Sequence, residues 1–337
     1  FLIVILFALV VLAVAVSSRS SELVAEIRNR RYQILLGELV FAVAFLMFAL
    51  YRARNPEIVG TEKPMEFAIL SSVMRSSTFP PPDPWLSGFS LNYYYFGYFI
   101  GGSIANLAGT AAAVAFNLFL TTIFSLTAMV TFSLGRDLLG LYRSTSTNVA
   151  LNVTGGLAAV FVLVAGNLTS YQLIIDSQVR EKNYWQGIGW NASRVLQQSN
   201  NAGELQDYTI TEFPAFSFVL GDLHPHLIAL PFTLLATACA LSWLLLWGNR
   251  SSSYRGTIPL TIITALLLGA LHVINPWDYP SFIALTIVAS LVGLFICGQR
   301  KQWISLTLHL VIMIVLSLLL YLPYHLHFQP FITQFGL

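Results

Sequence analysis

The sequence predicts an all-α, polytopic membrane protein, and its composition carries most of that prediction. Hydrophobic residues make up 56% of the 337 positions and charged residues only 9%, whereas a soluble domain is about 25% charged. The mean hydropathy is +0.72. A soluble fold of this length could not bury so much apolar surface, so lipid must cover it. The net charge of +2 is too small to indicate a nucleic-acid partner.

Apolar runs long enough to cross a bilayer, about 20 residues each, give about eight spans. We place them at 1–17, 33–51, 113–134, 149–170, 227–247, 257–273, 279–297 and 303–322. A ninth apolar stretch, 93–112, is rich in Tyr and Gly and either crosses or lies at the interface. The chain starts without Met inside an apolar run and stops soon after another span, so we expect a fragment of a longer protein, with 1–337 forming a single transmembrane domain.

The distribution of basic residues decides the orientation. If 93–112 does not cross, ten of the 17 basic residues fall in four short loops on one side: Arg19, Arg28, Arg30, Arg31, Arg136, Arg143, Arg250, Arg255, Arg300 and Lys301. If 93–112 does cross, these clusters fall on opposite sides. We therefore predict a juxtamembrane or re-entrant helix at 93–112, with 52–112 and 171–226 as the two long extracytoplasmic loops of a plasma-membrane protein. The short connections 274–278 and 323–337 lie on the same side.

The first extracytoplasmic loop, with interfacial helices, carries two acids on one helical face. Thr61 is placed to cap a helix whose first turn contains Glu62, Lys63 and Pro64, and proline is tolerated in a first turn because its missing N–H would be unpaired anyway. Glu62 and Glu66 lie four residues apart and share a face. An apolar stripe follows at Met65, Ile69 and Val73. Either the carboxylates face a cavity, or the helix lies on the surface with a favourable acidic first turn.

The rest of that loop is rich in proline and aromatic residues. The run 80–85 is a stiff, polyproline-like segment that would hold Asp83 and Trp85 in fixed positions. Three consecutive tyrosines follow Asn92: Tyr93, Tyr94 and Tyr95. An interfacial aromatic belt explains any one of these rings. Three in a row behind a rigid turn are typical of the wall of a site.

The second loop ends in a run of possible ligands. Pro225 favours an extended conformation at His224, and alternate residues of an extended run point the same way. Asp222, His224 and His226 would then form one face, suited to a divalent metal such as Mg or Mn, or to an acid–histidine network that holds a phosphate. The alternative is a hydrogen-bonded entry into the following span.

Two further polar groups lie at the later turns on this side. His272, Asn275, Trp277 and Asp278 mark one turn, and His325 and His327 mark the last. Ionisable groups near membrane depth tend to be functional. Cys239 and Cys297 fall in apolar runs, so we expect packed or lipid-facing thiols and neither a disulfide nor a metal pair.

Together the segments EKPMEFAIL, FPPPDPWLSG, LNYYYFGY, FSFVLGDLHPH and NPWDYP resemble the YYY-motif family of uncharacterised polytopic membrane proteins. The resemblance covers roughly residues 57–280. That family is in turn distantly similar to the GT-C glycosyltransferases, whose topology agrees with the one that the basic residues predict. Those enzymes use an acidic pair in the first outer loop, and Lys63 stands here where the pair would continue after Glu62.

The resemblance implies a GT-C-like glycosyltransferase that moves a sugar from a polyprenyl-phosphate carrier to an acceptor on the extracytoplasmic face. Glu62 would be the general base or would order the acceptor, with Glu66 and Asp83 as alternates. The substrate-binding positions would be Lys63, Trp85, Asn92, Tyr93, Tyr94, Tyr95, Asp222, His224, His226, His272, Asn275, Trp277 and Asp278. Membrane lipid, the lipid-linked sugar and an acceptor are the expected partners. The alternatives are a transporter or flippase of a lipid-linked substrate, and a structural subunit of a membrane complex.

Overall fold

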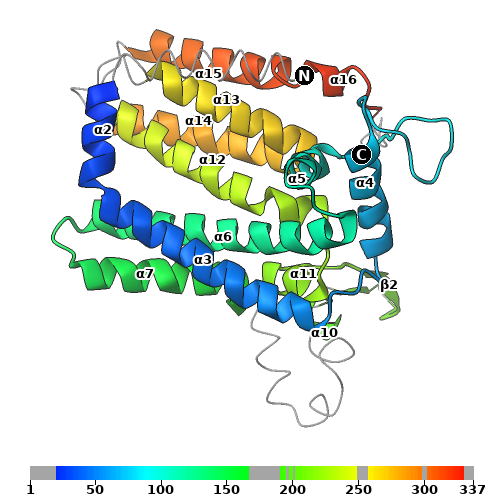
Figure 1. The fold of residues 1–337 in the computed structure, drawn as a ribbon. Helices are drawn as coiled ribbons and strands as arrows, with labels where there is room; N and C mark the ends of the chain where they lie inside the picture. Colours follow the sequence, from blue (N-terminus) through cyan, green and yellow to red (C-terminus); the bar gives the residue numbers. More distant parts are fainter. Residues whose placement is uncertain are drawn as a thin grey trace.

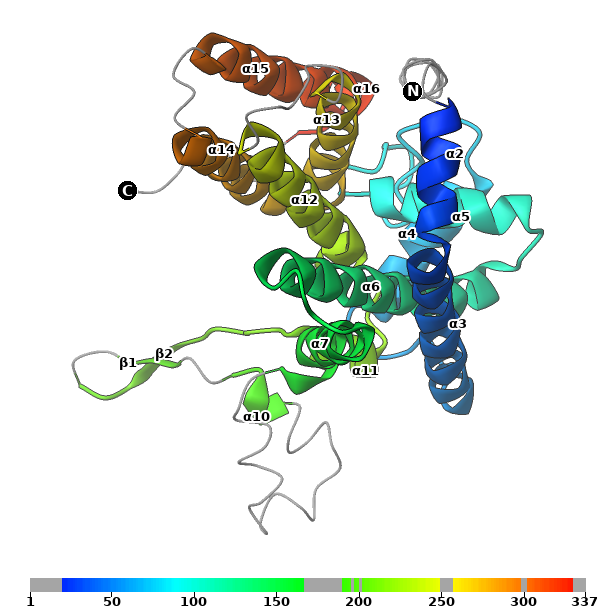
Figure 2. The same ribbon diagram turned by 90° about the vertical axis from the view of Figure 1, so that its left-hand side faces the viewer.

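The computed structural model describes residues 20–166, 190–194, 197–199, 202–248, 257–297 and 302–329. Helices dominate these residues (Figure 1). They are α2 Ser20–Asn29, α3 Arg31–Arg54, α4 Lys63–Arg75, α5 Phe96–Leu107, α6 Ala112–Tyr142, α7 Asn148–Val160, the π-helix η1 Phe161–Ala165, α10 Trp190–Ala192, α11 Pro214–Leu220, α12 Pro225–Trp247, α13 Thr257–Ile274, α14 Asp278–Cys297, α15 Trp303–Leu319 and α16 Leu322–His325. Two short antiparallel strands, β1 Gln197–Ser199 and β2 Leu205–Tyr208, project away from the helices (Figure 2).

Six of these helices are long and apolar enough to cross a membrane: α3, α6, α7 with η1, α12, α13 and α14. This confirms a polytopic helical membrane protein. The predicted span 1–17 lies outside the described residues, and α15 is a shorter apolar helix of 17 residues. The span predicted at 113–134 is part of a 31-residue helix. Large apolar side chains such as Leu35, Leu46 and Met47 stay exposed on α3, as lipid-facing positions require.

Helix α5 is too short to cross. Its 12 residues span about 18 Å at 1.5 Å per residue, against a hydrocarbon core of about 30 Å. Glycines on α5 permit close packing: a Cβ at Gly101 would lie 2.5 Å from the ring of Phe119 on α6. A Cβ at Gly97 would lie 2.8 Å from Ile228 on α12. The helix is therefore seated against the ends of the spans, as predicted for 93–112.

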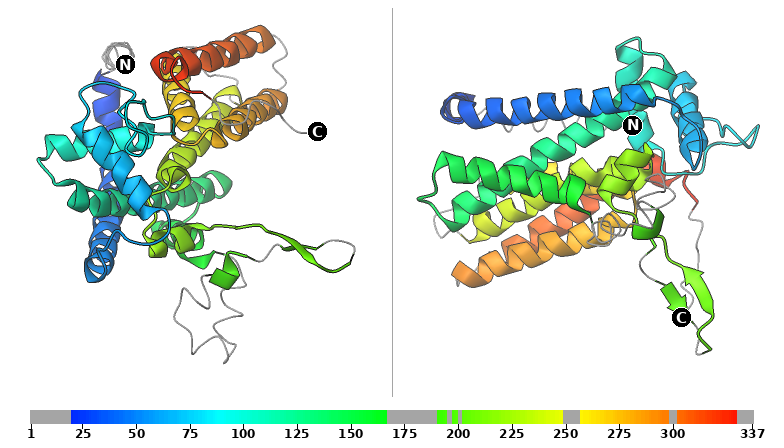
Figure 3. Two further views of the ribbon diagram at one scale, coloured as in Figure 1. Left: turned by 90° about the vertical axis from the view of Figure 1, so that its right-hand side faces the viewer. Right: turned by 90° about the horizontal axis from the view of Figure 1, so that it is seen from below.

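The polar motifs gather at one end of the helix bundle. Figure 1 shows α4, α5, α11 and α16 at the right-hand end, and Figure 3 shows the same end face-on. Hydrogen bonds join these segments: Tyr98 Oη donates to the Leu223 carbonyl at 2.9 Å, and Asn92 Nδ2 donates to the Gln329 carbonyl at 2.9 Å. Figure 1 shows the α6–α7 connection at the opposite end.

An aromatic cluster fixes α11 against the spans. The rings of Phe48 on α3 and Phe124 on α6 stack at 4.5 Å. Phe218 on α11 meets Phe124 edge-on at 5.0 Å and Phe48 at 5.7 Å. Such pairs contribute about 0.5–1.5 kcal/mol each beyond burial. This packing positions the segment 221–226, which follows α11 directly.

Candidate acid–histidine site

Glu62 and Glu66 both reach His224, but α4 starts one residue later than predicted, so only Glu66 is part of the helix. The apolar residues Ile69 and Val73 are buried, which confirms the stripe. Thr61 does not cap the helix: its φ is +53°, and the N-cap residue is Glu62, which makes no side-chain capping bond. A left-handed Thr61 directs the chain into the helix one residue later than expected. The Glu62 side chain instead reaches His224, with Oε2 at 2.9 Å from Nδ1.

Glu66 holds the segment after α11 with both carboxylate oxygens. Its side chain is 0% exposed. Oε2 accepts the backbone N–H of Leu223 at 2.7 Å, and Oε1 lies 3.1 Å from His224 Nδ1. Charge-assisted bonds of this kind are about twice as strong as neutral ones. The buried carboxylate therefore fixes the ring of His224 beside the exposed end of Glu62.

His224 lies between two acids on the edge of the membrane-spanning bundle. It is the N-cap residue of α12, in the extended conformation that Pro225 favours. Burial alone would lower the pKa of His224, but the hydrogen bond to Glu66 and the charges of Glu66, Glu62 and Asp222 raise it overall. The site therefore stabilises an imidazolium.

Asp222 is a buried carboxyl beside the same group. Burial, and next the negative charge of Glu66, raise the pKa of Asp222 to about 8. One of its oxygens, Oδ1, is buried without a hydrogen-bond partner among the described residues. Two carboxylates that interact closely cannot both ionise cheaply. Asp222 is therefore the member of the cluster that keeps a proton near neutral pH.

The three residues of the 222–226 strip do not form one ligand face. Helix α12 begins at Pro225, so His226 is helical and no longer follows the period of two of an extended run. His226 Nε2 contacts Glu212 at 3.0 Å instead, although its ring centroid stays 5.1 Å from that of His224. The hydrogen bond from His226 is the largest cause that lowers the pKa of Glu212.

The ligand set that does converge is Glu62, Glu66 and His224. One ligand atom from each lies within 4.8 Å of the others. Two carboxylate oxygens and one imidazole nitrogen suit a divalent cation such as Mn²⁺ or Mg²⁺. These residues fit such an ion only when His224 Nδ1 carries no proton. A metal and the imidazolium are therefore competing states of this site.

The tyrosines of the LNYYYFGY segment have separate surroundings. Burial, and next the charges of Glu62 and Glu66, raise the pKa of Tyr93, so Tyr93 lies beside the acids. Tyr94 packs on Phe328 at 5.5 Å and Tyr95 on Tyr324 at 5.5 Å. Tyr94 also packs on Tyr93, with ring centroids 5.2 Å apart, so these two rings are continuous, while Tyr94 and Tyr95 contact α16 and the residues that follow it.

A fourth tyrosine contacts the site directly. The fully buried hydroxyl of Tyr98 donates to the carbonyl of Leu223, the residue whose N–H is bound by Glu66. Sequence reasoning missed Tyr98, although it lies one helical turn after the Tyr94–Tyr95 pair, on the helix that the sequence predicted.

Three predicted residues of the α4–α5 connection have other roles: Asp83, Trp85 and Asn92. Asp83 accepts the N–H groups of Trp85 and Leu86 at 2.8 and 2.9 Å, so its carboxylate closes a turn. Trp85 is 62% exposed. Asn92 pairs with the backbone of Gln329 in both directions. Figure 1 shows the loop between α4 and α5 projecting from the end of the bundle.

The NPWD motif borders a second polar cavity. Glu212, His226, Asn275 and Asp278 line a space of about 300 Å³. Asn275 Nδ2 donates to Asp278 Oδ2 at 2.9 Å, whereas Trp277 is 67% exposed. Glu212 was not among the predicted site residues. Its position just before the helix that precedes Asp222 is the signal that could have indicated it.

His272 belongs to an aromatic stack. Its ring lies 4.4 Å from that of Tyr279 and 4.6 Å from that of His325. Burial lowers the pKa of His325. The ring of His325 therefore favours the neutral form, which suits its packing against His272. Cys239 is a buried free thiol, as its apolar surroundings predicted.

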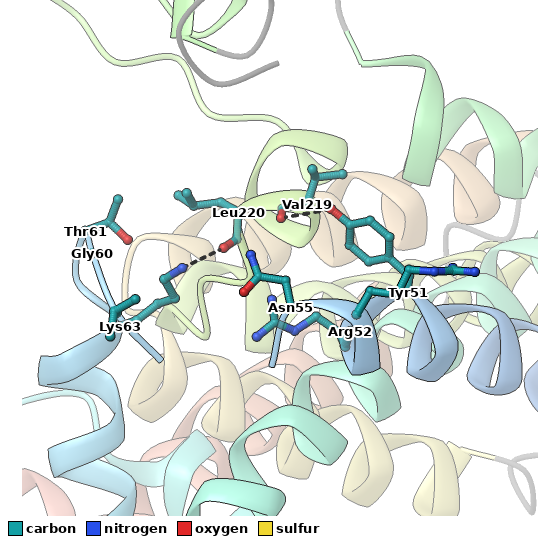
Figure 4. Close-up of a pocket in the computed structure, with 10 residues that line it drawn as sticks. Tyr51, Arg52, Asn55, Gly60, Thr61, Lys63, Val219 and Leu220 are labelled. Carbon is teal, nitrogen blue, oxygen red and sulfur yellow. Dashed lines mark hydrogen bonds between the residues drawn. The ribbon is translucent and has the colours of Figure 1, made fainter. Parts of the chain in front are cut away.

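A basic cavity lies at the start of α4 (Figure 4). Arg52, Arg54 and Lys63 contribute to its lining, and its volume is about 320 Å³. Lys63 Nζ donates to the Leu220 carbonyl at 3.1 Å, and Tyr51 Oη donates to the Val219 carbonyl at 3.3 Å. Lys63 was a predicted substrate-binding residue. Arg52 was missed, although a cation in the last turn of an apolar span is the kind of residue that marks a site.

Comparison with known proteins places the chain in a family. No curated protein and no solved structure matches it significantly. A family model described as "Uncharacterized membrane protein (DUF2298)" matches residues 1–337. The match spans every segment that builds the acid–histidine site. This chain therefore belongs to the DUF2298 family of membrane proteins.

Proposed function

We propose that this protein is a membrane-embedded transferase that moves a sugar from a polyprenyl-phosphate carrier to an acceptor hydroxyl. The observation that carries the proposal is the convergence of Glu62, Glu66 and His224 at the end of the spans. Glu62 is 57% exposed, whereas Glu66 is fully buried. The site thus has one carboxylate that a substrate can reach and one that holds the geometry.

Glu62 acts as the general base in this reaction. Its carboxylate takes the proton of the acceptor hydroxyl as that oxygen bonds to the anomeric carbon of the sugar. The bond from this carbon to the phosphate oxygen breaks, and the electron pair leaves with the carrier phosphate. A base of this kind contributes about 10²–10⁴-fold. His224, held by Glu66, positions this carboxylate through the 2.9 Å contact between its Nδ1 and Glu62 Oε2.

The surroundings of the site include an apolar region that suits the prenyl chain of the donor. The apolar cavity between α5 and α6, about 270 Å³ and lined by Ile104, Phe119 and Phe232 among others, lies at the same end of the bundle as α4. It offers an apolar surface for a prenyl chain. Where a divalent cation takes the place of the imidazolium, Glu62, Glu66 and His224 would hold it, and it would supply positive charge beside the acceptor hydroxyl. The basic-residue distribution favours the extracytoplasmic face for this end.

The test is a transfer assay with the full chain in lipid nanodiscs. Radiolabelled polyprenyl-phosphate sugars are supplied with lipid and peptide acceptors, and release of free polyprenyl phosphate is measured. Glu62→Gln should lower the rate by about 10²–10⁴-fold. The matched control is Glu57→Gln, which removes an exposed acid from the same connection and should leave the rate unchanged.

Full activity in Glu62→Gln would refute this role for Glu62. Absence of transfer by the wild-type protein with every donor would refute the transferase and favour a structural subunit. Movement of the intact lipid-linked sugar across the bilayer, without transfer, would favour the flippase.

A further inference from the structure

The basic cavity beside α4 carries positive charge that neighbouring carboxylates do not neutralise. Arg52, Arg54 and Lys63 contribute to its lining together with the uncharged Asn55 and Thr61. Among the described residues, no carboxylate lies within ion-pair distance of these three cations. Glu66 and Asp222 act on Lys63 only through longer-range attraction. The cavity is thus an electropositive space next to an acidic cluster.

Arg52 is the buried member of this group, with only 4% of its surface exposed. Its Nε and Nη2 atoms donate to Asn117 Oδ1 at 3.0 and 2.7 Å. The remaining nitrogen, Nη1, lies beside Gly221, where a Cβ would come within 2.6 Å of it. Burial of a cation without an anion is unfavourable because the charge loses its hydration. A neutral amide partner orients the guanidinium but leaves that charge uncompensated.

Lys63 reaches the same space from α4. One of its three N–H groups donates to the Leu220 carbonyl, which leaves two for a ligand. Figure 4 shows Lys63 and Tyr51 reaching the end of α11 from two sides, with Arg52 and Asn55 between them. Burial, and next the charge of Arg52, lower the pKa of Lys63. An anion between these two cations would relieve their repulsion.

We propose that this cavity binds a phosphate group, with Lys63 and Arg52 as its charged donors. Phosphate oxygens accept several hydrogen bonds at once, which matches the spare N–H groups of an ammonium and a guanidinium. The volume of about 320 Å³ equals roughly ten water molecules at about 30 Å³ each, enough for a phosphate with part of a sugar. Both Thr61 and Lys63 are sequence neighbours of Glu62, so the phosphate would lie next to the base.

Identification of this group as the donor's phosphate rests on the proposed function; phosphate binding itself does not. The 222–226 strip, predicted to hold the phosphate, is less suited to that task because Glu62 and Glu66 already face His224. Two carboxylates there would repel a second anion. The two sites would thus have different tasks. The acidic cluster takes the proton of the acceptor hydroxyl, and the basic cavity binds the leaving phosphate.

Binding of two probes tests the proposal without turnover. The full chain is titrated in detergent with inorganic pyrophosphate, and in nanodiscs with polyprenyl phosphate, and the dissociation constant is measured by calorimetry and thermal shift. Lys63→Gln should weaken binding by about 10- to 100-fold, the loss of one or two charge-assisted bonds. The control is Arg75→Gln, which removes an exposed cation from the other end of α4 and should change binding less than about twofold.

Arg52→Lys provides a second variant, because loss of this buried charge could unfold the chain. It keeps the charge and loses the fork-shaped donor set, so we expect a folded protein with weaker binding. Binding of both probes would indicate a general phosphate site, and binding of polyprenyl phosphate alone would indicate a lipid headgroup. Equal affinity in the wild type and Lys63→Gln would overturn the site even if sugar transfer is found. Loss of binding in Lys63→Gln would support it even if transfer is not found.

Discussion

Glu66 and His224 meet 158 positions apart in the sequence, with the carboxylate oxygen 3.1 Å from the imidazole Nδ1. The same carboxylate binds the N–H of Leu223 with its other oxygen. One fully buried side chain on α4 thereby sets both the backbone entry into α12 and the ring of the histidine that faces Glu62. The acid–histidine site depends on this contact.

Replacing Glu66 should weaken the fold as well as the site. Glu66→Ala leaves the Leu223 N–H buried without an acceptor and His224 without one of its two acids, which should cost about 3–5 kcal/mol of unfolding free energy. Glu66→Gln keeps an acceptor for Leu223 and should cost less. Thermal unfolding in nanodiscs measures both. Equal stability of Glu66→Ala and the wild type would contradict the anchoring role.

Tyr98 should contribute to stability through its buried hydroxyl. Tyr98→Phe leaves the Leu223 carbonyl without that donor in a buried setting, and we expect a loss of about 1–3 kcal/mol. Tyr142→Phe is the control, since Tyr142 is largely exposed at the end of α6. The measurement is the unfolding midpoint of each variant. A larger effect in the control than in Tyr98→Phe would rule out the role given to the hydroxyl.

Asp222 should make stability fall as the pH rises. The folded protein keeps the Asp222 proton up to about pH 8, whereas an unfolded chain loses it near the ordinary value of 3.8. Between these values the native state binds more protons, so the free energy of unfolding decreases with pH. Asp222→Asn is neutral throughout and should make this decrease smaller, leaving the part that comes from the raised pKa of His224.

Unfolding midpoints of the wild type and Asp222→Asn between pH 5 and 8.5 measure this difference. His325, whose pKa is lowered by burial, is present in both proteins, so its contribution cancels when the two curves are compared. The window also lies above the lowered pKa of Glu212. Parallel curves for the two proteins would contradict the raised pKa of Asp222.

Binding of a divalent cation should depend on pH in the opposite sense. A metal on His224 Nδ1 must displace the proton that the acids favour there, so affinity should rise with pH. Thermal shifts with Mn²⁺ at pH 6 and pH 8 should show stabilisation mainly at pH 8. Glu62→Gln should remove most of it and Glu57→Gln none. Equal stabilisation in all three proteins at both pH values would exclude this ligand set.

The orientation can be measured by cysteine labelling. Ser87 lies in the α4–α5 loop and Ser144 in the α6–α7 connection, both exposed. After replacement of Cys239 and Cys297, single cysteines at these positions should label from opposite sides, with Ser87→Cys accessible from outside the cell. Labelling of both cysteines from the same side would refute the predicted topology. Labelling of Ser87→Cys only from the cytoplasm would reverse it.

The sequence by itself determined the class of protein and the placement of most helices. Hydropathy is a local property, so the runs that became α3, α12, α13 and α14 could be identified within a few residues. A helix at 93–112 that does not cross was also predicted, because a crossing there would place the short basic loops on opposite sides of the membrane; α5, with 12 residues, is short. The gathering of the polar motifs at one end also follows from the number of spans, because each crossing determines the side on which the next connection lies.

Only the tertiary structure decided which side chains meet. Glu66 contacts His224 and not Asp83, because the segment at the end of α11 lies against the start of α4. Lys63 shares a cavity with Arg52 for the same reason. His226 leaves the predicted ligand face because α12 starts at Pro225 and rotates it toward Glu212. Contacts between segments more than 150 residues apart depend on how helices pack, which hydropathy and motif spacing do not encode.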